Sequence, residues 1–125
     1  MTRRRRPAER LIPLPTDGAV RETKLLGLIG LGLRGGLVVV GAEQVRAAAR
    51  KGKLAMAVVA PDASRNSLDK VVPLLEARRV RIIRGPAAAS LGAAVGREST
   101  AAVGILDRKL ADGICRLAET GDGAP

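Results

Sequence analysis

Four short apolar runs, set between longer helical patterns, constrain the fold of this chain more than any other feature of its sequence. The second run is continuously apolar, as expected for a central strand covered on both faces. We expect each run to form a strand: Leu37–Val40, Leu54–Ala60, Val80–Ile83 and Ala101–Leu106. Strands that alternate with helical segments favour the α/β class.

Helical patterns fill the intervals between these runs. The first contains apolar residues at helical spacing from Leu25 to Leu33, with Asp17 or Thr23 as a possible N-cap and Gly35-Gly36 after its end. Further helices are expected over residues 42–51, from the loop at 61–64 to 79 with a kink or a new start at Pro73, over 87–95 and over 108–119.

This order of elements predicts a three-layer α/β/α sandwich on a four-stranded mixed sheet. At 125 residues the chain has room for one domain. We expect a flexible basic arm over residues 1–20, a single α/β domain over 21–119 and a disordered tail over 120–125, in a protein that is a monomer.

The composition excludes several classes of function. Phe, Tyr, Trp and His are all absent. RNA modules that stack bases on aromatic rings are therefore excluded, and so is catalysis by an imidazole acid or base. Cys115 stands alone, so we interpret it as a packing residue in a reducing compartment. We predict a cytoplasmic protein that is not an enzyme, with no catalytic residue, cofactor, metal ion or membrane partner.

The charge of the chain points to a polyanionic partner. Lys and Arg total 22 against 12 Asp and Glu, a formal charge of +10. Residues 1–10 contain five arginines and one acid, Glu9, so the rest of the chain is still basic at +6. Such a surface favours binding to phosphates, because each neutralised phosphate releases condensed counterions. A composition bias toward Arg and Ala is the alternative explanation.

A glycine-rich segment matches the dinucleotide-binding pattern G-x-G-x-x-G by its letters, at Gly30, Gly32 and Gly35. That pattern binds a pyrophosphate only between a strand and a following helix. Here a helical pattern precedes it and the strand Leu37–Val40 follows. We therefore interpret the match as a coincidence.

The segment that begins at Gly41 is the strongest candidate for recognition of RNA. It starts a helix directly after a strand, and its first turn contains Glu43 and Gln44. Free amides at a helix N-terminus attract phosphate, and the Gln44 amide could both donate to and accept from a base edge. A capped surface helix, with Glu43 complementing the helix dipole, explains the same residues and is favoured by local physics alone.

The span from about Lys24 to Leu117 resembles the L7Ae and L30e family of ribosomal proteins, which bind kink-turn RNA. The resemblance covers most of the chain, in segments with matching order and spacing: Leu25–Leu28, Arg34–Val38, Gly41–Val45, Arg50–Lys53, Val58–Ser64, Leu91–Gly96 and Ala101–Leu106.

The resemblance implies that Gly41 and the start of its helix contact the sheared G·A pairs of a kink-turn, while the loop 97–100 closes over the bent strand. The predicted RNA-binding residues are Arg34, Gly41, Ala42, Glu43, Gln44, Arg46, Arg50, Lys51, Arg97, Glu98, Ser99 and Thr100. The chain departs from the family pattern, which often has Asn-Glu and a Lys three residues later. It has Glu43-Gln44 and Ala47 instead, although Arg46 or Arg50 could compensate for the missing Lys.

The leading hypothesis is a non-catalytic protein that binds structured RNA, of the kink-turn or ribosomal kind, and is associated with the ribosome. One alternative is a protein-interaction or regulatory module that has kept the fold and lost RNA specificity. Another is a substrate-recognition domain like those attached to some RNA methyltransferases, for which this chain has no catalytic domain.

Overall fold

The computed structural model describes residues 17–121, and the side chains of residues 18–118. Helices and strands alternate along these residues in the expected order. They are α2 (Asp17–Arg34), β1 (Val38–Val40), α3 (Ala42–Arg50), β2 (Met56–Val59), α4 (Arg65–Ala77), β3 (Arg81–Arg84), α5 (Ala88–Ala94), β4 (Ala102–Ile105) and α6 (Arg108–Gly121).

The four strands form one mixed sheet in the order β1-β4-β2-β3. β4 is antiparallel to both β1 and β2, whereas β2 and β3 are parallel. The central strands β2 and β4 are buried along their whole length, as expected for strands covered on both faces. The prediction of a four-stranded mixed sheet is confirmed.

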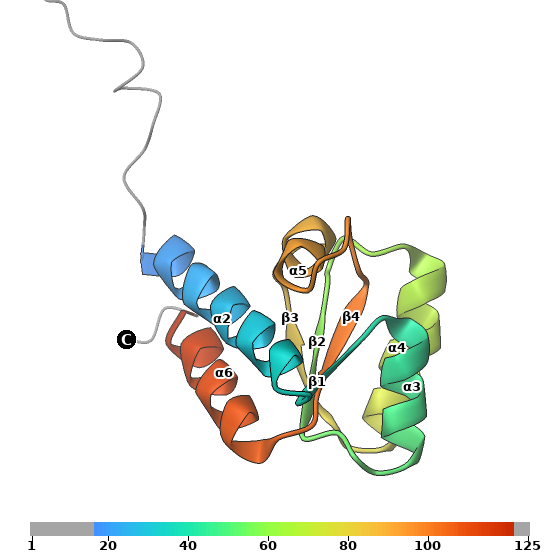
Figure 1. The fold of residues 1–125 in the computed structure, drawn as a ribbon. Coiled ribbons are helices and arrows are strands. Elements are labelled where there is room, and N and C mark those ends of the chain that lie inside the picture. The colour runs from blue at the N-terminus through green and yellow to red at the C-terminus, as the bar shows by residue number, and fades with distance from the viewer. Residues whose placement is uncertain (1–16, 122–125) are drawn as a thin grey trace, which may run out of the picture.

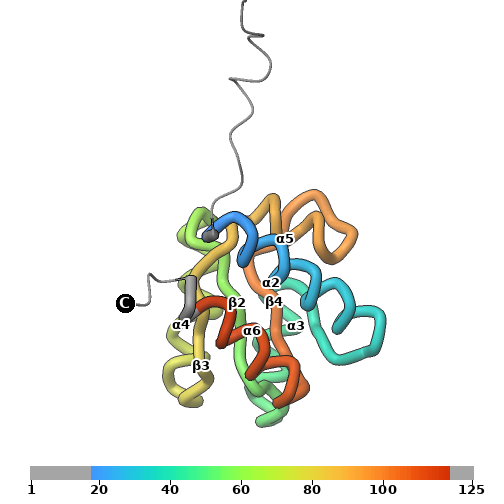
Figure 2. Tube along the Cα trace, turned by 90° about the vertical axis from the view of Figure 1, so that its left-hand side faces the viewer, coloured from blue at the N-terminus to red at the C-terminus, as the bar shows by residue number. Residues whose placement is uncertain are grey.

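Helices cover both faces of the sheet. Figure 1 shows α2 and α6 on one side of the strands and α3 and α4 on the other, and Figure 2 shows α2 and α6 in front of the sheet. Each layer encloses its own apolar cluster, one around Ile29, Met56 and Ile114, the other around Val45, Val59 and Leu75. The three-layer sandwich is thus confirmed, with an aliphatic core.

The glycine-rich segment at Gly30–Gly35 does not form a dinucleotide loop. It covers the last turns of α2 and the turn into β1, as the sequence predicted. A Cβ at Gly32 would lie 2.4 Å from Leu110 Cδ2 and 2.8 Å from Val38 Cγ2. The small residue lets α2 pack closely on α6 and β1. Cys115 is likewise a packing residue, because it is buried and its Sγ lies 3.6 Å from Met56 Sδ.

The limits of two helices differ from the predictions. α2 begins at Asp17, so residues 17–20 are helical and not part of a flexible arm, and α6 continues to Gly121. Thr23 is not the N-cap; it lies inside α2, where its hydroxyl donates to the Ala19 carbonyl at 3.0 Å. The remaining parts of the expected arm and tail, 1–16 and 122–125, lie outside the described residues.

The helix α4 continues through Pro73 without a new start. Pro73 is exposed, whereas Val71 and Leu75 are buried on the opposite face. Packing of that face holds the helix together, although proline removes one backbone hydrogen bond.

Candidate nucleic-acid interface

One edge of the sheet gathers the segment ends that the sequence singled out. The register places Val40 opposite Val103, and Val59 opposite both Ala102 and Arg84. The ends of β1, β2 and β3 and the start of β4 therefore meet at one edge, which lies at the top of Figure 1. We call it the Gly41 edge; it comprises residues 41–46, 60–65, 84–88 and 96–101.

Gly41 forms the corner between β1 and α3. Its φ of 94° and ψ of 155° are rarely adopted by residues with a side chain. Its amide donates to the Ala102 carbonyl at 2.9 Å, and its own carbonyl accepts from Val45 at 3.0 Å. No side chain caps the start of α3. Its first amides are therefore left to a solvent molecule or a ligand.

Gln44 is only partly free to contact a ligand. Its Oε1 accepts a hydrogen bond from the main-chain N–H of Val40 at 3.2 Å. Leu37 and Gly41 pair with β4 through Leu106 and Ala102, so the Val40 amide faces the open side of the sheet. The Gln44 amide was expected to offer both a donor and an acceptor to a base edge, but its oxygen already has Val40 as a partner. The Gln44 oxygen satisfies an amide on the unpaired side of β1, and the Gln44 NH₂ group keeps two donors.

Glu43 and Arg46 interact with each other. Arg46 Nη1 lies 3.6 Å from Glu43 Oε1, and the two side chains are 26% and 74% exposed, respectively. The Arg46 Nε is buried without a hydrogen-bond partner. Arg46, which the sequence predicted as an RNA-binding residue, is therefore only partly exposed. Its aliphatic stem packs inward while its charge is paired with Glu43.

The loop 97–100 is held against α5 next to the start of α3. The Arg97 amide donates to the Gly92 carbonyl at 2.7 Å, and the Thr100 amide donates to Ala88 at 3.1 Å. A Cβ at Gly92 would lie 2.4 Å from Ser99 Cα, so only glycine leaves room for the loop. No residue was predicted to pack in this way, although a glycine inside a short helical segment is a signal for the close approach of another backbone.

Thr100 is not available to RNA, in contrast to the prediction. It is only 7% exposed, and its hydroxyl donates to the Ala102 carbonyl at 3.2 Å. The Gly41 amide donates to the same carbonyl, so Thr100 joins the loop to the start of α3. Arg97, Glu98 and Ser99 are exposed, as a contact surface requires.

Asp62 also belongs to the Gly41 edge, and the sequence did not single it out. Its Oδ1 accepts from the Ala88 amide at 2.8 Å and so ties the β2–α4 loop to the first turn of α5. Ser64 caps α4 through a bond from the Ser67 amide at 3.1 Å. The amides that begin α4 and α5 are thereby partly satisfied, which leaves the start of α3 as the uncapped one at this edge.

The predicted residues Arg34, Arg50 and Lys51 lie elsewhere. Arg34 ends α2, and Arg50 and Lys51 end α3. The end of α3 lies at the opposite edge of the sheet, where the four strands are aligned at Val38, Ile105, Met56 and Arg81. We call it the Arg50 edge. Arg50 and Lys51 thus lie toward the end of the sheet opposite to Gly41. The hollow that Lys51 lines also contains Gln44, and Arg34 borders α5 next to Ser90, Ala93 and Ala94.

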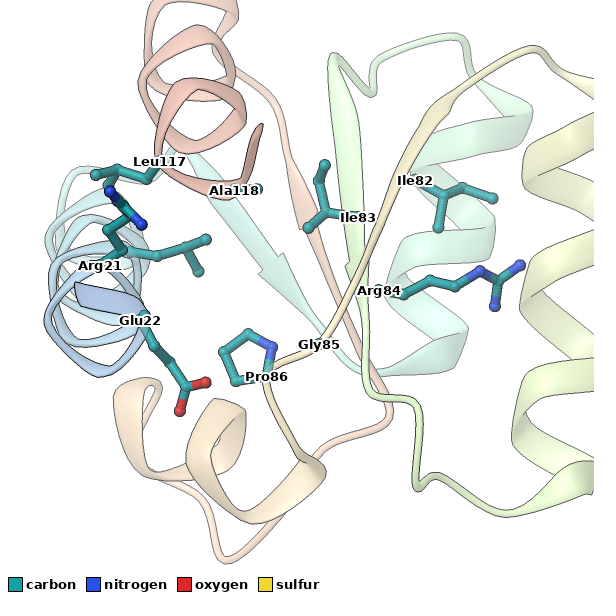
Figure 3. A pocket seen from close by; sticks show the side chains of 11 residues that line it. Arg21, Glu22, Ile82, Ile83, Arg84, Gly85, Pro86, Leu117 and Ala118 are labelled. Carbon is teal, nitrogen blue, oxygen red and sulfur yellow. The ribbon is translucent and has the colours of Figure 1, made fainter. Parts of the chain in front are cut away.

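A hollow of about 470 Å³ lies between α2, β3 and α6. Figure 3 shows Ile83 and Pro86 facing it, with Arg21 and Glu22 beside it, while Arg84 points away. None of the predicted RNA-binding residues lines it. Residues 17–121 contain no cluster of three or more His, Cys, Asp or Glu that could hold a metal ion. None of the helices in this part of the chain is long and apolar enough to cross a membrane.

Comparison with known proteins identifies a family. Residues 23–114 match the model of the ribosomal protein L7Ae/L30e/S12e/Gadd45 family. No curated protein matches the chain.

Solved structures share the fold. One is a protein with unknown function from Bacillus halodurans, with a TM-score of 0.72 and 23% identity over 78% of this chain and 99% of that one. Another is the 15.5 kD RNA-binding protein of Giardia lamblia, with a TM-score of 0.65 and 19% identity over 90% of this chain and 95% of that one.

Proposed function

Since the chain belongs to the ribosomal protein L7Ae/L30e/S12e/Gadd45 family, we propose that it is a non-catalytic protein that binds structured RNA through its Gly41 edge. The main supporting observation is that the uncapped start of α3 lies beside the exposed loop 97–99. The two segments are connected because Gly41 and Thr100 both donate to the Ala102 carbonyl. Family membership supports RNA binding in general. A kink-turn or ribosomal RNA as the ligand is our further proposal.

Recognition at this edge would depend more on hydrogen bonds than on charge. Its four arginines, at positions 46, 65, 84 and 97, are offset by Glu43, Asp62 and Glu98 to a formal charge of +1, and Arg46 is already paired with Glu43. Main-chain amides of α3 can donate to phosphate or to base acceptors. An ionised Glu43 accepts only, so it would face base N–H groups, while the Gln44 NH₂ group would donate to a base acceptor.

Gly41 fits this role because nothing lies within 4 Å of the position that a Cβ would take. An RNA backbone or base edge can therefore approach the helix start closely. Bases would not be stacked on rings, since the chain has no aromatic residue. We expect the protein to act as a monomer in the cytoplasm, in association with ribosomal RNA or a ribonucleoprotein.

The decisive experiment varies the RNA and leaves the protein unchanged. Binding is measured for a short kink-turn RNA, for the same RNA with its sheared G·A pairs replaced by G·C pairs, and for a plain duplex of equal length. The replacement removes the kinked shape at constant charge, so we expect affinity to fall about 100-fold or more, on the order of 3 kcal/mol. Equal affinity for all three RNAs would contradict shape recognition and favour a module without RNA specificity.

A further inference from the structure

The positive charge of the folded region is concentrated at the edge opposite to the proposed recognition site. Residues 17–121 contain 17 basic and 10 acidic side chains, a formal charge of +7. Six basic residues follow or end the helices α3 and α4 or begin β3 at the Arg50 edge: Arg50, Lys51, Lys53, Arg78, Arg79 and Arg81. Arg108 and Lys109 begin α6 at the same edge.

All eight of these basic residues are exposed. The acids nearby are Glu76 and Asp107, so the Arg50 edge has a formal charge of +6. Apart from Arg81, these residues form no ion pair with any residue whose side chain is described. By contrast, Glu43, Asp62 and Glu98 leave the Gly41 edge with a charge of only +1. The electrostatic attraction for a polyanion is therefore stronger at the Arg50 edge than at the Gly41 edge.

Helix stabilisation explains only part of this cluster. Cations near the C-terminal ends of α3 and α4 are favoured by the helix dipole. Arg108 and Lys109 instead occupy the N-terminal turn of α6, where the dipole disfavours cations. Asp107 caps that turn, with its Oδ2 accepting from the Leu110 amide at 2.9 Å. The two cations at this position add to the surface charge without helping the helix.

Arg79 provides a second indication. Its φ of 58° lies in the left-handed region, where glycine or asparagine is usual. The position closes α4 and leads into β3, and the amide of Arg79 donates to Glu76 at 3.0 Å. An exposed arginine there gives no backbone advantage.

We propose that the Arg50 edge is a second RNA-binding surface, which holds the phosphate backbone of an RNA helix without reading its sequence. The inference extends the proposed function, because it assumes that RNA is the ligand. The strands spanning the two edges are three or four residues long, about 10–13 Å at the usual rise. The protein would therefore contact two RNA segments at opposite ends of one sheet. The Gly41 edge supplies shape selectivity, and the Arg50 edge supplies most of the salt-dependent affinity.

The test compares two double variants of the full chain with the same change in net charge. Lys51→Gln/Lys53→Gln alters the Arg50 edge, and Lys24→Gln/Lys70→Gln alters exposed lysines on the outer faces of α2 and α4. Binding to a plain RNA duplex is measured over a range of salt concentrations, together with the melting temperature of each variant.

We expect the Lys51/Lys53 variant to reduce the slope of log affinity against log salt by about two. The Lys24/Lys70 variant should leave the slope within about half a unit of the wild type. Equal slopes for the two variants would overturn the proposal, since the edge would then contribute only to net charge. The proposal would also be overturned if the Lys51/Lys53 variant kept its affinity for duplex RNA and lost binding to phosphatidylserine vesicles. An anionic membrane would then be the partner of this edge.

These outcomes are separate from those that test the Gly41 edge. Recognition there fails if the wild type does not prefer kink-turn RNA to the duplex. The slope difference between the two variants would stand or fall independently of that preference.

Discussion

Gln44 protects the open edge of the sheet by accepting the N–H of Val40 with its side-chain oxygen at 3.2 Å. The same side chain keeps two N–H donors on its exposed side, next to the uncapped start of α3. One residue therefore has a structural acceptor and a free donor group. A substitution that changes only one of them can separate stability from recognition.

We predict that Gln44→Glu retains the bond from Val40 and therefore melts near the wild-type temperature, while Gln44→Ala loses about 1 kcal/mol of stability. In Gln44→Glu a carboxylate replaces the donors. Affinity for kink-turn RNA should fall by about 1–3 kcal/mol. Ala47→Glu, one turn away and exposed, controls for the added negative charge. Equal losses in Gln44→Glu and Ala47→Glu would show that the Gln44 donors make no contact with RNA.

Gly41→Ala should destabilise the fold without a steric clash. No atom lies within 4 Å of the added Cβ, so the penalty comes from the φ of 94° alone. We expect a loss of about 1–3 kcal/mol in the free energy of unfolding, measured by urea denaturation. Gly27→Ala is the control, because its Cβ also meets nothing within 4 Å but its backbone is helical. It should stabilise the protein by about 0.5–1 kcal/mol. A Gly41→Ala variant as stable as wild type would show that the corner relaxes to an ordinary backbone conformation.

Gly92→Ala should displace the loop 97–99 and weaken selective RNA binding. The added Cβ would lie 2.4 Å from Ser99 Cα and 2.6 Å from the Ser99 amide nitrogen, which are backbone atoms and cannot turn aside. We expect the preference for kink-turn RNA over duplex to fall about 10-fold or more, with a loss of stability of about 1–3 kcal/mol. Hydrogen exchange of the Arg97 and Thr100 amides reports whether the loop has opened. Retained selectivity with an opened loop would exclude the loop from the interface.

The order of elements and the three-layer fold were predictable because strand runs such as Leu54–Ala60 and helical spacing such as Leu25–Leu33 are local signals. The placement of the predicted RNA-binding residues at both ends of the sheet could not be predicted from such local signals. Gln44 and Arg50 belong to one helix of nine residues, and six residues along a helix correspond to about 9 Å. They therefore approach opposite edges of the sheet, although they are close in sequence. The burial of Thr100 and the bond from Val40 to Gln44 also depend on which strands become neighbours, which no local pattern contains.

Deletion of residues 1–16 should lower affinity for every RNA by a similar factor. The deleted segment contains Arg3–Arg6 and Arg10 against one acid, Glu9, and it precedes the first described helix. Its loss should reduce the salt slope and leave the melting temperature unchanged. A lower melting temperature would show that the segment packs on the domain. A changed preference between kink-turn and duplex would show that it contributes to selectivity.

Ala47→Lys should restore a contact that the family pattern often contains and this chain lacks. Ala47 is exposed, and it lines a shallow hollow along the open side of β1 together with Gln44, Lys51 and Lys53. A lysine there would add a cation between the Gly41 edge and the Arg50 edge. We expect kink-turn affinity to rise on the order of 5-fold at low salt and the salt slope to steepen by about one unit. Ala19→Lys, on the exposed face of α2, adds the same charge away from both edges. It should leave the kink-turn affinity and the salt slope close to those of the wild type. If the two variants bind RNA equally well, the hollow beside Gln44 does not face the RNA, and the bound strand must follow another course across the molecule.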